Sequence, residues 1–215
     1  MKHGKDNLKT KIIKASYNAL ACHLGSSLSC AYIIKEIYKK KKKRDLFVFS
    51  KASGVAALYC YLYPLKKATE LLKKFPLPAK EAGLILSTGS LGHGLPFATG
   101  LAFADRTRDV YVLLGDAEMQ EGTFWESLLF KNQHKLDNLK IYVDMNGLQA
   151  LGKVKDILCV PHWFCESMGV NLVKTIKGQG VDFLEDKVES HYLNLNEDGF
   201  KKAIFQLNVE ESKKR

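Results

Sequence analysis

Apolar residues gather in short runs separated by polar turns, and these runs predict strands that alternate with helices. Residues 110–114 and 139–143 have the length and composition of buried strands. Between them, residues 118–126 open an amphipathic helix. Strand, helix and strand in this order form the unit of a parallel sheet. The pattern therefore predicts an α/β fold.

The rest of the chain supplies further elements of both kinds. We expect a strand within residues 44–51, two helices separated near Pro64 within 54–75, and helices at 5–22, 32–38, 96–104 and 196–207. Ser29 is expected to cap the second helix.

Length and composition indicate one globular domain over residues 1–215, with a hydrophobic fraction of 46%. The chain has neither a run of about eighteen apolar residues nor an apolar signal core at its start. We therefore expect a cytoplasmic protein without membrane contact. The five cysteines form no C-x-x-C pair, so neither a zinc site nor a disulfide framework is predicted.

The net charge of +10 and the basic run at residues 39–44 raise the question of nucleic-acid binding. Nearly all the basic residues are lysines, whereas recognition of bases and phosphates prefers arginine. The run follows an amphipathic helix, whose C-terminal dipole favours cations. We interpret it as a solvated helix end and expect no nucleic-acid partner.

Two polar residues stand just beyond the predicted strands, Asp116 after the first and Asn146 after the second. The carboxyl ends of parallel strands face one crevice, so both side chains are expected at the same place. A hard divalent cation prefers carboxylate and amide oxygens and completes its shell with phosphate oxygens. The competing interpretation is a helix N-cap for Asp116 and a turn residue for Asn146.

The residues around this pair resemble the thiamine-diphosphate motif of the transketolase family. Residues 115–126 and 143–149 match it in order and flanking sequence, and Asp116 and Asn146 are separated by about the family spacing. The resemblance extends over residues 15–203. It implies the thiamine-diphosphate-binding fold, in which helices cover both faces of a mostly parallel sheet in three layers.

The resemblance implies a site for thiamine diphosphate and Mg²⁺, with Ca²⁺ as an alternative metal. The residues implied to bind the cofactor are Gly89, Ser90, Leu91, Gly115, Asp116, Ala117, Asn146, Leu148 and His191. Asp116, Asn146 and the backbone carbonyl of Leu148 are implied to hold the metal.

Three further residues take catalytic roles by resemblance. His23 is implied to face the substrate carbonyl, and His191 to reach both the diphosphate and the substrate. Glu121 is implied to lie at a subunit interface that couples two active sites. Without the resemblance, His23 is a structural histidine at a helix end and Glu121 a helix acid favoured by the dipole.

The chain also departs from the family. Histidines are missing after Ser50 and in the loop at residues 75–83. Ala117 replaces a glycine, which costs little at negative φ and strains the turn at positive φ. A helix and a strand that relatives place between residues 164–173 and 174–181 are absent. We expect either a sheet one strand smaller or a deletion that compromises the fold.

The implied reaction is the transfer of a two-carbon ketol unit between sugars or sugar phosphates, a step of carbohydrate metabolism. The glutamate that activates the aminopyrimidine belongs, in the family, to a second domain for which this chain has no room. A separate chain with the pyrimidine-binding and C-terminal domains is therefore implied, in a heterotetramer of two copies of each. The alternatives are a degenerate assembly or regulatory subunit of the same fold, and a basic binding protein unrelated to thiamine chemistry.

Overall fold

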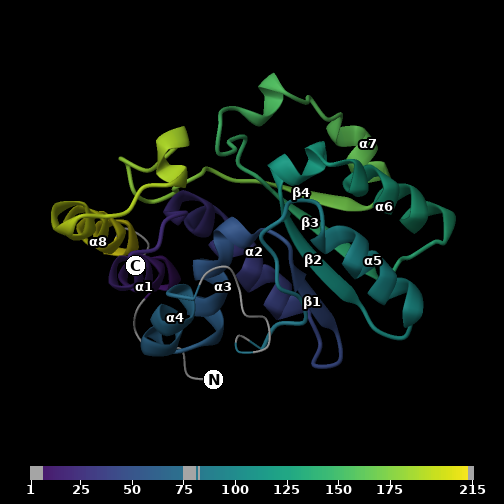
Figure 1. The fold of residues 1–215 in the computed structure, drawn as a ribbon, viewed down its shortest axis with the longest axis horizontal. Coiled ribbons are helices and arrows are strands. Elements are labelled where there is room, and N and C mark those ends of the chain that lie inside the picture. Colours follow the sequence, from purple (N-terminus) through teal and green to yellow (C-terminus); the bar gives the residue numbers. More distant parts are fainter. Residues whose placement is uncertain (1–6, 75–80, 82, 213–215) are drawn as a thin grey trace.

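The core of the molecule is a parallel sheet of four strands. The computed structural model describes residues 7–74, 81 and 83–212. The strands, in their order in the sheet (Figure 1), are β1 (Leu46–Phe49), β2 (Val110–Gly115), β3 (Leu139–Met145) and β4 (Val170–Lys174). All pairings are parallel. The carboxyl ends of the four strands therefore lie together, at what we call the strand-end edge.

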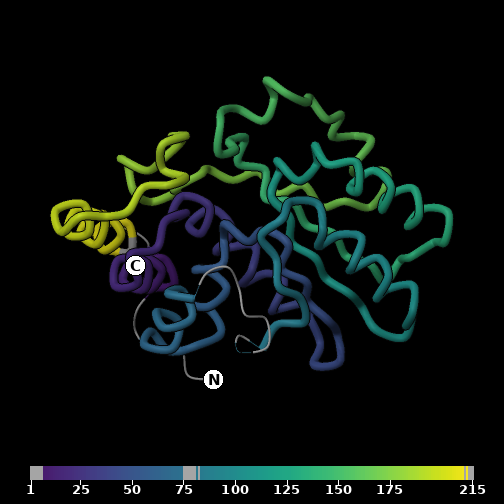
Figure 2. Tube along the Cα trace, viewed as in Figure 1, coloured from purple at the N-terminus to yellow at the C-terminus, as the bar shows by residue number. Residues whose placement is uncertain are grey.

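Helices cover both faces of the sheet, as Figures 1 and 2 show. One side of the sheet carries α1 (Leu8–Ala19), α2 (Leu24–Lys40), α3 (Val55–Leu62), α4 (Leu65–Leu72) and α8 (Glu197–Ser212). The other side carries α5 (Gly94–Ala104), α6 (Gly122–Gln133) and α7 (His162–Ser167). The predicted three-layer α/β fold is confirmed. Within the described ranges, no helix is both long enough and apolar enough to cross a membrane.

Alternation along the strands divides the buried side chains between two cores. In β2, Val110 and Val112 face the side of α5 and α6, whereas Tyr111 and Leu113 face the side of α2. Every residue of β2 is buried. A strand covered on both faces has a continuous apolar sequence, which is why the run of residues 110–114 predicted it correctly.

The second helix begins earlier than predicted. Because α2 starts at Leu24, Ser29 lies within the helix, and the prediction that it caps the helix is wrong. The Ser29 hydroxyl instead donates to Asp144 Oδ2 at the end of β3, at 2.5 Å. The last helix, α8, is longer than predicted and continues to Ser212. Most of the loop predicted at 75–83 lies outside the described residues.

The sheet remains intact where the helix and strand of the family are missing. β4 leads straight into the turn that carries Lys177, and within the described part of the chain it pairs with β3 alone. Its side chains still contribute to both cores, with Val170 on one side and Val173 on the other. Of the two expectations, the structure therefore favours a smaller sheet over a compromised fold.

Candidate functional site

Asp116 connects the ends of β2 and β3. Its side chain is buried, its Oδ1 accepts the Ala117 N–H at 3.0 Å, and its Oδ2 accepts the Gly147 N–H at 2.5 Å. Because Gly147 directly follows Asn146, the two predicted metal ligands lie at one place, as expected. Burial raises the pKa of Asp116, although the charge of Lys51 opposes this. An ionised Asp116 is therefore stabilised by any cation that binds beside it.

The Asn146 side chain is buried with part of its amide unpaired. Its Oδ1 accepts the Leu148 N–H at 3.1 Å, whereas its Nδ2 has no hydrogen-bond partner among the described residues. Leaving such a group unsatisfied costs about 1–3 kcal/mol. Gly147, whose φ is 78°, provides the tight turn between Asn146 and Leu148. The edge therefore contains a buried amide donor that the described part of the chain leaves unsatisfied.

Ala117 has a backbone conformation that suits alanine. It lies in a short 3-10 helix, η2 (Asp116–Gln120), and it is not among the described non-glycine residues with positive φ. Alanine therefore causes little strain at this position, which is the outcome expected for a negative φ.

A buried ion pair lies beside Asp116. Lys51 follows β1, and its Nζ is 3.4 Å from Asp144 Oδ2, with side chains 5% and 0% exposed. Asp144 also accepts hydrogen bonds from the hydroxyls of Ser29 and Thr175. Burial lowers the pKa of Lys51, but Asp144 and Asp116 raise it more, so the net shift is upward. The edge thus contains a fixed positive charge.

Glu118 joins three loops around the edge. Its fully buried carboxylate accepts hydrogen bonds from the Ser50 hydroxyl, from the Gly115 N–H at 2.8 Å and from the Gly92 N–H at 3.3 Å. Burial raises its pKa. Gly92 has a φ of 79°, and a Cβ there would lie 2.6 Å from Thr123 Oγ1, so the turn requires glycine. These contacts hold the loop before α5 against the end of β2.

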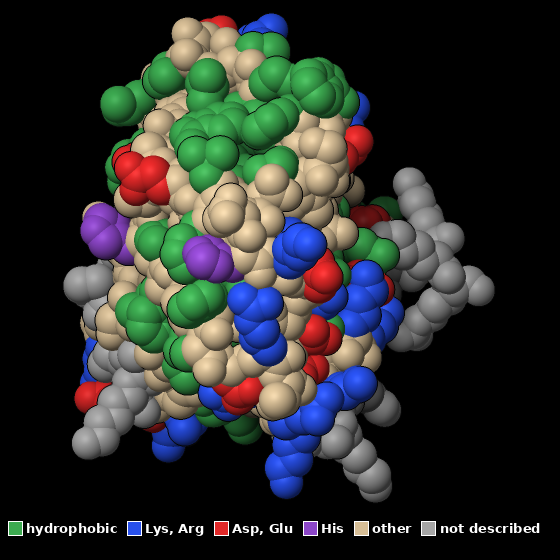
Figure 3. Space-filling model, turned by 90° about the vertical axis from the view of Figure 1, so that its right-hand side faces the viewer, with side chains coloured by type: hydrophobic (Ala, Val, Ile, Leu, Met, Phe, Trp, Pro, Cys, Tyr) green, Lys and Arg blue, Asp and Glu red, His purple; other side chains and the backbone are tan. Residues whose placement is uncertain are grey.

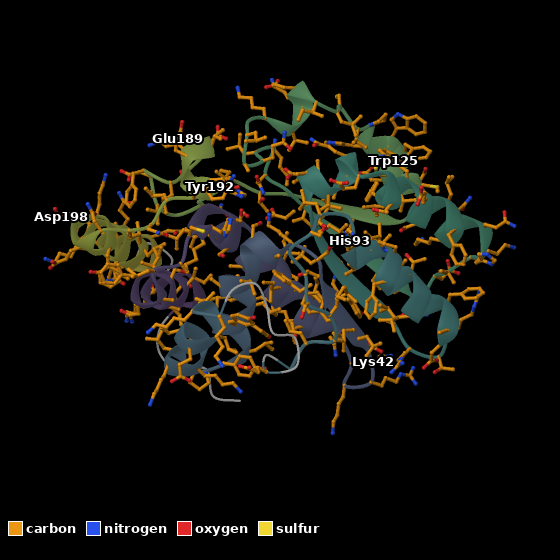
Figure 4. All side chains as sticks on the ribbon, in the orientation of Figure 1. Lys42, His93, Trp125, Glu189, Tyr192 and Asp198 are labelled. Carbon is orange, nitrogen blue, oxygen red and sulfur yellow. The ribbon has the colours of Figure 1, made fainter. Side chains whose placement is uncertain are left out.

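The predicted residues Gly89, Ser90 and Leu91 precede this anchored turn and are exposed. Glu121 is half-buried at the start of α6, close to Gly92. These four residues therefore lie on the side of the edge that belongs to α5 and α6. Figure 4 labels His93, at the start of α5, on the same side.

His23 and His191 come together on the opposite side of the edge. Their ring centroids are 4.8 Å apart, and the backbone N–H of His23 donates to the backbone carbonyl of His191 at 3.0 Å. Tyr192, labelled in Figure 4, is 64% exposed, and its ring lies 4.6 Å from His191. Cys22 Sγ is 3.2 Å from His23 Nδ1. Burial lowers the pKa of His23.

Lys177 links the histidines to the strand ends. Its side chain is fully buried, and its Nζ lies 3.2 Å from His191 Nδ1 and 3.4 Å from the Gln149 carbonyl. Burial, with the charge of Lys51, lowers the pKa of Lys177 to about 8. Burial, with the charge of Lys177, lowers the pKa of His191 to about 4. Because Gln149 follows Leu148, the histidines and the turn after β3 border one space.

Sequence patterns did not single out Lys51, Lys177 or Asp144. Each stands at or shortly after the end of a parallel strand, which is the rule that identified Asp116 and Asn146. Lysine is rarely buried, so its position alone did not suggest a role at the site.

A groove of about 560 Å³ lies elsewhere, between α2 and β4. Tyr32, Lys40, Tyr142 and Leu172 are among its lining residues, and the charged groups of the strand-end edge are not. The candidate site therefore rests on the polar contacts at the strand ends and not on this groove.

Comparisons with known proteins identify relatives of this chain. The family model described as transketolase, thiamine diphosphate binding domain, matches residues 13–190. In an alignment 259 positions long, gaps included, the chain is 31% identical to one of the subunits that make up the apulose-4-phosphate transketolase of Actinobacillus succinogenes, with 94% of each protein covered. It is 29% identical over 244 residues to 6-deoxy-6-sulfo-D-fructose transketolase subunit SqwG of Clostridium sp., with 87% of this chain and 89% of that protein covered.

A solved transketolase from Campylobacter jejuni has the same fold. It superposes with a TM-score of 0.79 at 21% identity, and the match covers 96% of this chain and 46% of that chain. This chain thus spans about half the length of the solved protein. At this identity the likeness concerns the fold, and it agrees with the three layers described above.

Proposed function

The chain belongs to the transketolase family, in its thiamine-diphosphate-binding part, and on this premise we propose that it is the cofactor-binding subunit of a two-chain transketolase. The complex would transfer a two-carbon ketol unit between sugars and would be active only with the partner chain. The observation that carries the proposal is the unpaired Asn146 amide beside the buried carboxylate of Asp116. A phosphate oxygen would accept the hydrogen bond that the Asn146 Nδ2 lacks, and a divalent cation bound to that phosphate would offset the buried charge of Asp116.

The residues present at the edge fit a diphosphate and a divalent cation. Asp116, Asn146 and the carbonyl of Leu148 offer three oxygens, which is the donor type that Mg²⁺ and Ca²⁺ prefer. The described residues hold no cluster of three His, Cys, Asp or Glu side chains able to bind a metal. The proposed metal therefore depends on phosphate oxygens to complete its shell. Lys51 and Lys177 add positive charges, which would offset the negative charges of the phosphates.

The remaining residues are assigned by their place around this edge. Thiamine diphosphate, when bound, supplies an electron sink for cleavage of a carbon–carbon bond. We assign His23 and His191 to the substrate oxygens, since both border the same space as the turn after β3. The backbones of Gly115 and Ala117 would approach the diphosphate. The loop of Gly89, Ser90 and Leu91 would approach the aminopyrimidine ring.

An apolar surface supports the proposal of a partner chain. Figure 3 shows hydrophobic side chains gathered on the face formed by α5, α6 and α7. Phe97, Phe103, Leu129 and Phe130 are 38% to 64% exposed there, and the rings of Phe103 and Phe130 pack at 5.3 Å. We propose that a chain with the pyrimidine-binding and C-terminal domains docks on this face, near Glu121, in a heterotetramer. Residues 1–215 would then be a single diphosphate-binding domain.

The substrate is proposed from the relatives. Two of them are named for apulose 4-phosphate and for 6-deoxy-6-sulfo-D-fructose, and both are named as subunits. We infer a specialised sugar or sugar phosphate as the substrate of this chain, with a separate chain as its partner.

Calorimetric titration of thiamine diphosphate tests the proposal. The purified chain is titrated with and without Mg²⁺, alone and mixed with a candidate partner chain. We expect saturable binding that requires Mg²⁺ and is tightened by the partner. Asp116→Ala is expected to abolish this binding while the far-ultraviolet circular dichroism stays unchanged.

Asp109→Ala is the matched control, because Asp109 directly precedes β2 at the opposite end of the strand, where its carboxylate lies 3.9 Å from Lys140 Nζ. It is expected to leave the titration unchanged. Binding that survives Asp116→Ala would reject the metal site. If no sample binds the cofactor, the missing histidines have ended the chemistry, and a non-catalytic assembly or regulatory subunit of the same fold becomes the better proposal.

A further inference from the structure

Lys177 is fixed against His191 by the backbone around it. The Gly178 N–H donates to the Gly25 carbonyl at 2.9 Å, and the Lys177 carbonyl accepts the Asp186 N–H at 3.0 Å. The fully buried side chain then places Nζ 3.2 Å from His191 Nδ1. This contact joins two segments that are each anchored by their own hydrogen bonds.

The chemistry of the two groups determines which nitrogen of His191 carries a proton. An ammonium group has three N–H donors and no acceptor. The Nδ1 that faces it must therefore present its lone pair. A neutral imidazole with a lone pair on Nδ1 carries its proton on Nε2. A second proton on Nδ1 would point at the positive charge of Lys177, which disfavours the imidazolium form.

We propose that Lys177 is a positioning residue that holds His191 as its neutral Nε2–H tautomer, so that His191 donates a hydrogen bond to a substrate oxygen instead of acting as a base. The identity of that oxygen, a ketose carbonyl or hydroxyl, rests on the proposed function. A neutral imidazole donor polarises such an oxygen without adding a positive charge beside Lys177. The rings of His23 and Tyr192, with centroids at 4.8 Å and 4.6 Å, restrict rotation of His191.

The charges around the pair support the same state at neutral pH. The pKa of His191 is lowered to about 4 by burial, by Lys177, by His23 and by Lys51. The pKa of Lys177 is lowered only to about 8, because Asp116 and Asp144 oppose burial and the charge of Lys51. At pH 7 the imidazole is therefore neutral while most of the amine is charged.

Nitrogen NMR of the purified chain with labelled histidine measures the tautomer without cofactor or partner. The His191 signals are identified by their loss in His191→Gln. We expect the Nε2–H tautomer in the wild type at pH 7. In Lys177→Met, we expect a mixture of both tautomers and a His191 pKa that rises from about 4, while burial still keeps it below the ordinary value of about 6.5. Lys177→Arg, which retains a charged donor, is expected to restore the Nε2–H form.

The exposed His162 is the internal control, and its signals are expected to stay the same in every variant. An Nδ1–H tautomer or an imidazolium in the wild type at pH 7 overturns the proposal, and so does an unchanged His191 spectrum in Lys177→Met. If Lys177→Met fails to fold, the His191 tautomer measured in the wild type and in Lys177→Arg still tests the proposal. Failure of the calorimetric test rejects the proposed function and leaves this result standing.

Discussion

Replacing Lys51 by methionine tests whether the buried ion pair holds the strand-end edge together. Methionine keeps the apolar stem of lysine and removes the charge. The carboxylate of Asp144 then remains fully buried, and the hydroxyls of Ser29 and Thr175 are its remaining donors among the residues that the structure describes. The free energy of unfolding should fall, because an unpaired buried charge is costly.

The magnitude follows from the geometry. Two unit charges 3.4 Å apart attract by about 5 kcal/mol at an effective dielectric constant of about 20. Removing one partner of a buried pair costs about 3–5 kcal/mol in practice. Ser29 and Thr175 still stabilise the carboxylate of Asp144, so we expect Lys51→Met to lower the free energy of unfolding by about 3 kcal/mol, the smaller end of that range.

Urea unfolding, followed by the fluorescence of Trp125 and Trp163, measures the loss. Asp144→Asn and the double variant complete a cycle, in which the double variant should lose at least about 1 kcal/mol less than the sum of the single losses. The exposed Lys42, labelled in Figure 4, is the matched control, and Lys42→Met should change stability by less than about 0.5 kcal/mol. Losses that simply add, or a loss below about 1 kcal/mol for Lys51→Met, would refute the reasoning.

Three further predictions concern η2 and α5. Ala117→Gly should lower the free energy of unfolding by about 0.5–1 kcal/mol without tightening cofactor binding, since alanine already suits its backbone conformation; tighter binding in the calorimeter would contradict this. Glu118→Gln removes a carboxyl whose pKa is raised by burial, so the folded protein holds that proton more tightly than the unfolded chain. The stability of the wild type relative to this variant should therefore be greatest below about pH 4.5 and should fall as the pH rises above it; urea midpoints whose difference is constant or grows with pH would argue against this. Gly94→Ala places a Cβ 2.9 Å from Ser50 Cα and should cost about 1–3 kcal/mol. Gly100→Ala, on the same helix and next to open space, should instead gain about 0.5–1 kcal/mol, and equal melting temperatures of these two variants would exclude the packing argument.

The first three strands and the positions of Asp116 and Asn146 could be predicted because their physics is local. A run such as residues 110–114 has few alternatives to a buried strand, and the rule for parallel sheets places Asp116 and Asn146 at the same end. Each of these conclusions needs only the order of residues and one general rule of sheet geometry.

The contacts between distant segments could not be predicted in this way. Ser29 suits a helix cap by its residue type, yet its hydroxyl donates to Asp144, which lies on a different element. Lys51 and Lys177 are buried only because the fold brings carboxylates or a histidine within reach of their amines. The resemblance to a family implied that His23 and His191 each face the substrate, but their contact with each other was not predicted.

The strands lie in the sheet in the order in which the ribosome makes them. Each new strand can therefore pair with the one made just before it, and the sheet grows at one side during synthesis. The first helix, α1, cannot complete its packing so early, because the ring of its Tyr17 stacks on the ring of Phe200 in the last helix, with centroids 4.3 Å apart. Part of the apolar surface of α1 therefore stays uncovered until α8 has left the ribosome, and uncovered apolar surface makes a nascent chain prone to aggregation.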